Sequence, residues 1–148
     1  GEWYFGAVVA VDAVTTDAAS DSNNTLLSET AGYFSVMFRS SNGANVYTFD
    51  GGTKLVAKSI GTPPVAKILI EARATGGTTY IRVNKGTESS VAAGDVGNLL
   101  GALKLGANRT NTIFGNLKHG ELWMTAGDPG ATERNNQADY IMTKYGLP

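Results

Sequence analysis

The sequence predicts an all-β domain, a two-sheet antiparallel sandwich with one helix at its C-terminus. About nine or ten short segments rich in β-branched and aromatic residues are separated by glycine, proline and asparagine turn signals. No helical pattern lies between these segments, which argues against a parallel sheet with crossover helices. Glycine is abundant, at 19 of 148 residues, and charged residues make up only 17%, which is typical of many short strands joined by turns.

Composition limits the classes of function. A chain of 148 residues is one domain's worth and can bury a sizeable core. We therefore expect a single domain over residues 1–148, and its abrupt start with a strand suggests part of a longer protein. The net charge of −1 gives no electrostatic footprint for nucleic acid. Without cysteine, disulfides and thiolate metal sites are excluded, and no apolar run is long enough to span a membrane.

A helix is predicted from Ala131 to Tyr145. Four apolar residues at i, i+3, i+4 and i+7 form one face, namely Ala138, Ile141, Met142 and Tyr145. Arg134 falls on another face. Gly130 is the expected N-cap, Gly146 suits the left-handed C′ position, and Leu147 can complete a Schellman contact. Because so short a helix is marginal in water, it must pack on a sheet.

The expected strands precede this helix. Trp3 to Val11 is almost entirely apolar, which predicts a strand buried on both sides. Further strands are expected at Thr25 to Ser28, Tyr33 to Arg39, Asn45 to Phe49, Lys54 to Ile60, Val65 to Ala74, Thr78 to Asn84, Leu99 to Leu105 and around Leu122 to Met124. Thr87 to Asn98 is expected to be a loop. The Asn-Gly pair at 42–43 predicts a two-residue hairpin turn with Phe38 opposite Tyr47.

A second hairpin is predicted around the two glycines at 76–77, which allow positive φ at both central turn positions. The register then places the Arg73 guanidinium beside the Tyr80 ring, and Arg82 beside the Glu71 carboxylate. The core face of this hairpin would carry Ile68, Ile70, Ala72, Ile81 and Val83. The four polar residues would share the opposite face of the sheet.

Several motifs in the second half carry a resemblance. They are Gly120-Glu121 before an apolar strand, Glu133-Arg134, Tyr140, Lys144-Tyr145-Gly146-Leu147, Tyr80 to Asn84 followed by Lys85-Gly86, and Leu103 to Asn108. In these the chain resembles concanavalin A-like, laminin G-like jelly-roll domains, as found in phage and bacterial surface proteins. The resemblance implies a jelly roll, a rim calcium in many members, and a concave sheet lined by the second hairpin.

Catalytic chemistry is not expected. Hydrolases built on the resembled sandwich carry two glutamates in one short run, as acid and base or nucleophile. Here the six glutamates are widely spaced, although the fold can still bring Glu71 and Glu121 together. His119 is the only histidine, there is no Gly-x-Ser-x-Gly motif, and we interpret this histidine as a turn or strand-edge residue.

Calcium is the ion to consider, because only oxygen ligands are available. The best local source is the loop that holds Asp17, Asp21, Asn23 and Asn24. The simpler interpretation is a solvated loop that uses Asp and Asn for its turns. No cofactor is required, calcium is possible, and Asp128 is interpreted as a turn residue.

A saccharide site needs an aromatic face and planar polar groups. Tyr80, Arg82, Arg73 and Glu71 would supply both on an open sheet face. The alternative is a cross-strand ion pair that only keeps the surface soluble. On a wet surface, Arg82→Ala would leave the melting temperature within a few degrees. Trp123 is a second candidate platform, and the alternative for it is packing under the helix.

These observations favour a non-catalytic carbohydrate-binding module of an extracellular or virion protein. The alternative is a structural or adhesive module of a phage tail, head-fibre or bacterial surface assembly, and a glycoside hydrolase ranks third. The expected partners are a glycan or cell-surface polysaccharide, or other subunits of the virion or surface protein. Neither nucleic acid binding nor membrane insertion is expected.

Overall fold

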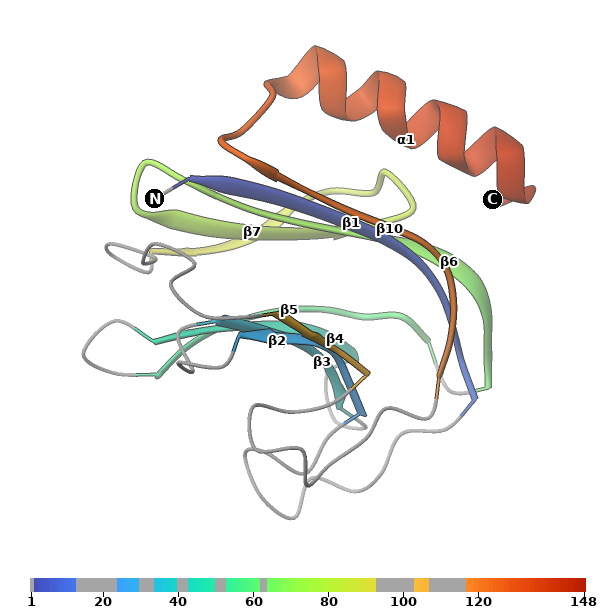
Figure 1. The fold of residues 1–148 in the computed structure, drawn as a ribbon, viewed down its shortest axis with the longest axis horizontal. Helices are drawn as coiled ribbons and strands as arrows, with labels where there is room; N and C mark the ends of the chain where they lie inside the picture. Colours follow the sequence, from blue (N-terminus) through green and yellow to red (C-terminus); the bar gives the residue numbers. More distant parts are fainter. Residues whose placement is uncertain are drawn as a thin grey trace.

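The protein is built in three layers, with a helix on one sheet and that sheet stacked on a second (Figure 1). The computed structural model describes residues 2–12, 24–29, 34–39, 43–49, 53–61, 64–92, 103–106 and 117–148. Within these ranges both sheets have five strands, and all strand pairs are antiparallel. The predicted two-sheet sandwich with a C-terminal helix is confirmed, whereas the jelly-roll connection stays a prediction.

Each sheet draws its strands from distant parts of the chain. The first has the order β10-β1-β6-β7-β8, with β10 at Leu117–Ala126, β1 at Trp3–Val11, β6 at Val65–Thr75, β7 at Thr78–Val83 and β8 at Ser89–Ala92. The second has the order β5-β4-β3-β2-β9, with β5 at Thr53–Lys58, β4 at Gly43–Phe49, β3 at Phe34–Arg39, β2 at Asn24–Glu29 and β9 at Leu103–Leu105. The strand pairings β1–β10 and β1–β6 place the chain's first strand inside the first sheet, next to the central strand β6.

Strand β8 corrects the expected loop over Thr87 to Asn98. Its sequence, Ser-Ser-Val-Ala, has no clear alternation, and the strand exists because it pairs with residues 78–81 of β7. Strand β10 is longer than the segment expected around Leu122 to Met124, and it lies at the edge of its sheet, where it is only partly buried. In both places the extent of the strand depends on pairing with a neighbouring strand, and the local sequence pattern does not indicate it.

The main core lies between the two sheets. Strand β1 is buried on both of its sides, and only one side faces this core. Trp3, Phe5 and Val9 point into this core, whereas Tyr4 and Val8 are buried on the opposite side, towards the helix. The prediction that β1 is buried on both sides is therefore confirmed. The predicted core face of the second hairpin is also confirmed, because Ile68, Ile70, Ala72 and Ile81 are buried in the same cluster and Val83 packs against it.

Helix α1 spans Ala131–Tyr145, as predicted. Gly130 is its N-cap, and Gly146 ends it in the left-handed conformation with φ 62°. The amide of Leu147 donates to the Met142 carbonyl at 2.9 Å, which confirms the Schellman end. Its apolar face packs on the first sheet in a second cluster of Val8, Leu69, Ala138 and Ile141, joined by Trp123, Met142, Tyr145 and Leu147. Among the described residues, no helix is long and apolar enough to cross the lipid bilayer.

The two hairpins had different outcomes. The glycines at 76–77 have φ of 55° and 72°, as the predicted turn requires. The register predicted for the first hairpin is wrong, since Phe38 pairs with Ala44 and not with Tyr47. The reason is that Gly43 belongs to β4 and pairs with Arg39, so that three residues separate the last paired positions where we expected two.

The outer face of the first sheet is shaped to receive the Trp123 indole. Gly6 pairs with Trp123 across β1 and β10, and a Cβ atom on Gly6 would lie 2.0 Å from Cζ2 of that indole. The ring also meets the Tyr4 ring edge-on, with centroids 6.4 Å apart. Trp123 therefore packs under the helix, which was one of the two interpretations open for it.

We expect Gly6→Ala to reduce the free energy of unfolding by about 1–3 kcal/mol, because the added methyl group displaces a packed indole. Urea unfolding measures this cost. The double variant Gly6→Ala/Trp123→Leu should be more stable than the sum of the two single effects predicts, since the smaller side chain relieves the clash. Additive effects of the two changes would show that the indole does not depend on this glycine.

Candidate functional site

The second hairpin places its four polar residues as predicted. Arg73 pairs with Tyr80, and Glu71 with Arg82, across β6 and β7. The guanidinium carbon of Arg73 lies 3.6 Å from the centroid of the Tyr80 ring. Arg82 donates two hydrogen bonds to Glu71, of 2.7 Å from Nε to Oε2 and 2.8 Å from Nη2 to Oε1. The register and both side-chain contacts are confirmed.

This face of the sheet is covered, however, and the expectation of an open surface is wrong. Glu71 is 2% exposed and Arg82 is 9% exposed. The Tyr4 hydroxyl donates to Oε1 of Glu71 at 2.7 Å from the neighbouring strand, and Nη1 of Arg82 donates to Oδ1 of Asn135 at 2.9 Å. Because Asn135 lies in the first turns of α1, the docked helix covers the part of the face that we expected to meet solvent.

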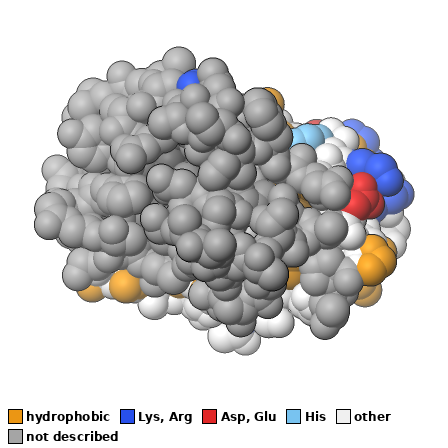
Figure 2. Space-filling view, turned by 90° about the horizontal axis from the view of Figure 1, so that it is seen from below, with side chains coloured by type: hydrophobic (Ala, Val, Ile, Leu, Met, Phe, Trp, Pro, Cys, Tyr) orange, Lys and Arg blue, Asp and Glu red, His pale blue; other side chains and the backbone are white. Residues whose placement is uncertain are grey.

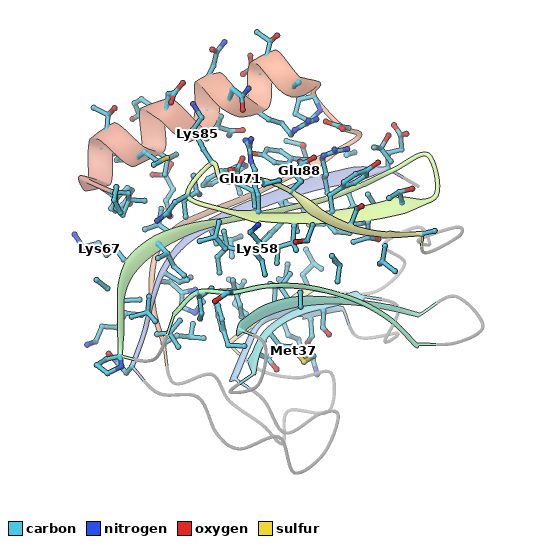
Figure 3. All side chains as sticks on the ribbon, turned by 180° about the vertical axis from the view of Figure 1, so that it is seen from behind. Met37, Lys58, Lys67, Glu71, Lys85 and Glu88 are labelled. Carbon is cyan, nitrogen blue, oxygen red and sulfur yellow. The ribbon has the colours of Figure 1, made fainter. Side chains whose placement is uncertain are left out.

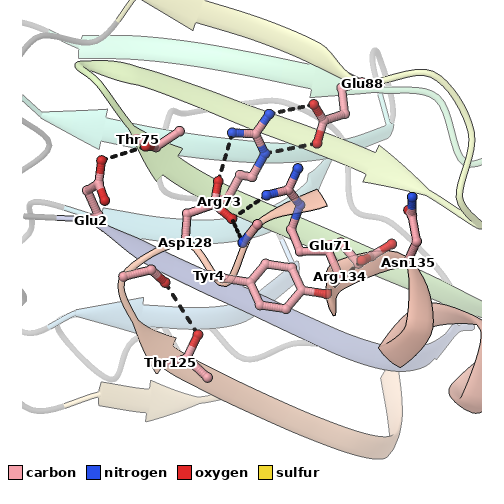
Figure 4. A network of polar contacts seen from close by, with 12 residues as sticks. Glu2, Tyr4, Glu71, Arg73, Thr75, Glu88, Thr125, Asp128, Arg134 and Asn135 are labelled. Carbon is pink, nitrogen blue, oxygen red and sulfur yellow. Dashed lines mark hydrogen bonds and ion pairs between the residues drawn. The ribbon is translucent and has the colours of Figure 1, made fainter. Parts of the chain in front are cut away.

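The other half of the face is closed by a second set of ion pairs (Figure 4). Arg73 donates to both oxygens of Glu88, at 3.0 Å from Nε and 2.6 Å from Nη2. Its Nη1 donates to Oδ2 of Asp128 at 3.2 Å. The Oδ1 atom of Asp128 accepts from Nη1 of Arg134 and, at 3.0 Å, from the backbone amide of Gly130. Asp128 is thus a turn residue, as predicted, and also a bridge between β6 and the helix.

Six charged residues make up this arrangement, which we call the ion-pair cluster: Glu71, Arg73, Arg82, Glu88, Asp128 and Arg134. Three are cationic and three anionic, so that the cluster is balanced in charge. The gap that all of these residues except Asp128 line together with Tyr4 and Tyr80 has no room for a water molecule. Each charged group of the cluster is therefore paired with an opposite charge inside the cluster, and no cavity for a ligand is left between them.

Burial and charge shift the pKa values of several groups in or beside the cluster, among them Tyr4, Glu88 and Asp128. Burial, together with the neighbouring Glu71 carboxylate, raises the pKa of the Tyr4 hydroxyl, which therefore stays a proton donor. Hydrogen bonds from Arg73 outweigh burial and lower the pKa of Glu88. Burial acts to raise the pKa of Asp128, but the Gly130 amide and the nearby arginines lower it overall. Both carboxyl groups are consequently held in their ionised form.

Two exposed ion pairs attach the helix further along its length. Lys85, in the turn after β7, contacts Asp139 at 2.5 Å, and Lys144 contacts Glu121 of β10 at 2.7 Å. The side chains of Asp139 and Lys144 are 63% and 44% exposed. Exposed pairs of this kind contribute about 0–1 kcal/mol each. The ion pairs at the start of α1 are buried, so they hold the helix more firmly than these two exposed pairs do.

The remaining predicted site residues lie apart from the cluster. His119 is exposed on the edge strand β10, as expected. Glu121 pairs with Lys144 and Glu71 with Arg82, so each of these two glutamates is held by a cation of its own. The calcium prediction over residues 17–24 lies outside the described residues, except that Asn24 begins β2. Within the described ranges, no group of three or more acidic or histidine side chains is placed to hold a metal.

Three residues in or beside the cluster were missed or misread in the sequence. Tyr4 looked like one more aromatic residue of a buried strand, and Glu88 fell in a segment expected to be a loop. Arg134 was placed on a solvent-facing side of the helix but is 8% exposed. The available signal was Asp128, two residues before the N-cap, because a carboxylate there can pair with an arginine in the first helical turn.

We expect Arg82→Met to lower the free energy of unfolding by about 3–5 kcal/mol, because it leaves Glu71 buried without its cation. This replaces the expectation of an almost unchanged melting temperature. Adding Glu71→Gln should restore most of the loss, since the uncompensated charge is then removed. Lys118→Met is the control, because it breaks an exposed pair with Asp12. If Arg82→Met costs no more than this control, the pair does not hold the helix.

Acid should weaken the fold through Glu88 and Asp128. Their folded pKa values lie below the ordinary 4.5 and 3.8, so their contribution is present above those values and is lost as the pH falls through the lower, folded ones. Urea unfolding from neutral to strongly acidic pH should show this decline, and Asp128→Asn should flatten it. Asp12→Asn, in an exposed pair, is the control. An equal slope for Asp128→Asn and the natural chain would contradict this assignment.

Comparison with known proteins does not assign the chain to a family. No family model matches it, and no curated protein matches it. The resemblance to concanavalin A-like domains therefore stays a prediction, and the confirmed description is a β-sandwich that carries a C-terminal helix.

Proposed function

We propose that this domain is a non-catalytic module of a larger extracellular or virion protein, with a structural or adhesive role. The observation that carries this proposal is the closed ion-pair cluster on the outer face of the first sheet. The cluster joins β6, β7 and the segment before β8 to the start of α1. In the proposed function, the cluster fixes the helix on the sandwich.

The partners within the cluster favour this role over saccharide binding on the same face. A sugar would need a free ring and free planar groups. The Tyr80 ring is already stacked by Arg73, and Arg82 already uses three nitrogen atoms on Glu71 and Asn135. Replacing these buried, charge-assisted bonds with bonds to a neutral sugar would lose more than it gains.

The same contacts argue against glycoside hydrolysis at this face. An acid catalyst needs a carboxyl group whose pKa is raised and which reaches the glycosidic oxygen. The pKa of Glu88 is lowered, and two nitrogen atoms of Arg73 hold its carboxylate. Glu71 is 2% exposed, held in the same way by Arg82.

Glycan recognition is the second candidate, at a different place on the surface. Tyr140, on the outer side of α1, is 62% exposed, and Lys144 lies beside its ring. An exposed aromatic ring offers an apolar face to the C–H groups of a sugar, and a neighbouring ammonium group can pair with a negative charge on that sugar. This observation favours an adhesive function over a purely structural one.

The first proposal is tested by offering the isolated domain neutral β-glucans and neutral oligosaccharides, with and without calcium. We expect no hydrolysis and no binding. Limited proteolysis should show that α1 is protected together with the sandwich, and that Arg82→Met exposes it to cleavage. Hydrolysis of a neutral glucan, or binding of a neutral glycan that Tyr80→Ala abolishes, would overturn the proposal.

A further inference from the structure

The C-terminal end of α1 brings two tyrosines and two lysines together. Nζ of Lys144 lies 5.6 Å from the centroid of the Tyr140 ring and 5.6 Å from that of Tyr145. Nζ of Lys67, from β6, lies 6.0 Å from the Tyr145 centroid. We call these four residues the Tyr–Lys strip. Figure 3 shows Lys67 beside the C-terminal end of the helix.

The strip is held in place by the packing beneath it. Tyr145 joins the apolar cluster under the helix, and a Cβ atom on Gly120 would lie 3.2 Å from its Cε1 atom. Glycine at that position therefore lets the ring approach β10 closely. The Schellman end at Gly146 and Leu147 fixes the last turn on which the ring is carried.

The polar groups of the strip are accessible. Tyr140 is 62% exposed, Lys67 is exposed, and the Lys144 side chain is 44% exposed. In the described part of the chain Lys67 has no carboxylate partner, and its ammonium group lies over the Tyr145 ring. Figure 2, seen from the side opposite the helix, shows lysine or arginine side chains together with an acidic side chain near the histidine at one end of the molecule.

An acidic residue of β10 opposes this charge. Glu121 pairs with Lys144 at 2.7 Å, but its side chain is 37% exposed, and hydrogen bonding to it raises the pKa of the Lys144 ammonium. An exposed pair is weak, so an incoming carboxylate or sulfate can compete with Glu121. The Lys67 ammonium does not have to leave a carboxylate in order to bind an anion.

We propose that the Tyr–Lys strip binds an anionic saccharide, with a sugar ring stacked on Tyr140 and its carboxylate or sulfate at the Lys144 ammonium. Lys67, at the Tyr145 ring, adds a second accessible positive charge at this end of the helix. The ring supplies an apolar face for the sugar C–H groups, and the ammonium groups supply point charges for a compact anion. The proposal extends the second candidate function. It does not depend on the role of the ion-pair cluster, so binding can fail while the Arg82 variants still destabilise the helix.

The test is calorimetric titration of the natural domain at low salt with three oligosaccharides: an oligouronate, a sulfated oligosaccharide and a neutral glucan. We expect binding of at least one anionic ligand and none of the neutral one, with the two anionic arms identifying the preferred group. Lys67→Gln, Lys144→Gln and Tyr140→Ala should each weaken binding by about tenfold. Tyr140→Phe, which keeps the ring, should bind like the natural domain.

Two controls separate a specific site from general charge attraction. Lys85→Gln removes the same charge from outside the strip and should leave affinity unchanged. Glu121→Gln should strengthen binding, because it frees Lys144, whereas Glu133→Gln makes the same change of net charge at the other end of the helix and should not. Absence of binding to either anionic ligand, or equal losses for Lys85→Gln and Lys67→Gln, would overturn the proposal.

Discussion

The burial of the Glu71 carboxylate beneath helix α1 is the constraint on which the outer layer depends. A charge removed from water is costly unless other groups replace its hydration. Here two nitrogen atoms of Arg82 and the Tyr4 hydroxyl do so, from both neighbouring strands. Arg82 in turn reaches Asn135 of the helix, so the helix position and the charge balance of the sheet are linked.

This link explains why two parts of the helix attach differently. Near its start, carboxylates and guanidinium groups are largely buried, with Arg134 at 8% exposure. Towards its end the contact is apolar, through Ile141, Met142 and Tyr145, with an exposed pair at Lys144. Apolar packing does not choose one position along the helix axis sharply, whereas the buried ion pairs would be left without partners if the helix shifted by one turn.

The sequence predicted the features that depend on neighbouring residues and missed those that depend on distant ones. The helix ends at the predicted residues because caps and apolar spacing are local signals. The Arg73–Tyr80 and Glu71–Arg82 pairs followed from the two-glycine turn. What covers those pairs was not predictable in the same way, because Glu88 and Asp128 approach Arg73 from 15 and 55 residues away. The first hairpin failed for a local reason, since Gly43 belongs to the strand and not to the turn.

The ion-pair cluster also affects which surfaces of the domain can bind another molecule. With α1 docked, the outer face of the first sheet is closed, and on the second sheet Thr25, Ser35 and Met37 are buried as well. Of the surfaces that the structure describes, the outer side of the helix remains open for contacts to other molecules. Among the described residues the helix end presents an exposed ring beside accessible ammonium groups. A helix held firmly at its start can carry such groups without reorganising when a ligand arrives, which lowers the entropic cost of binding.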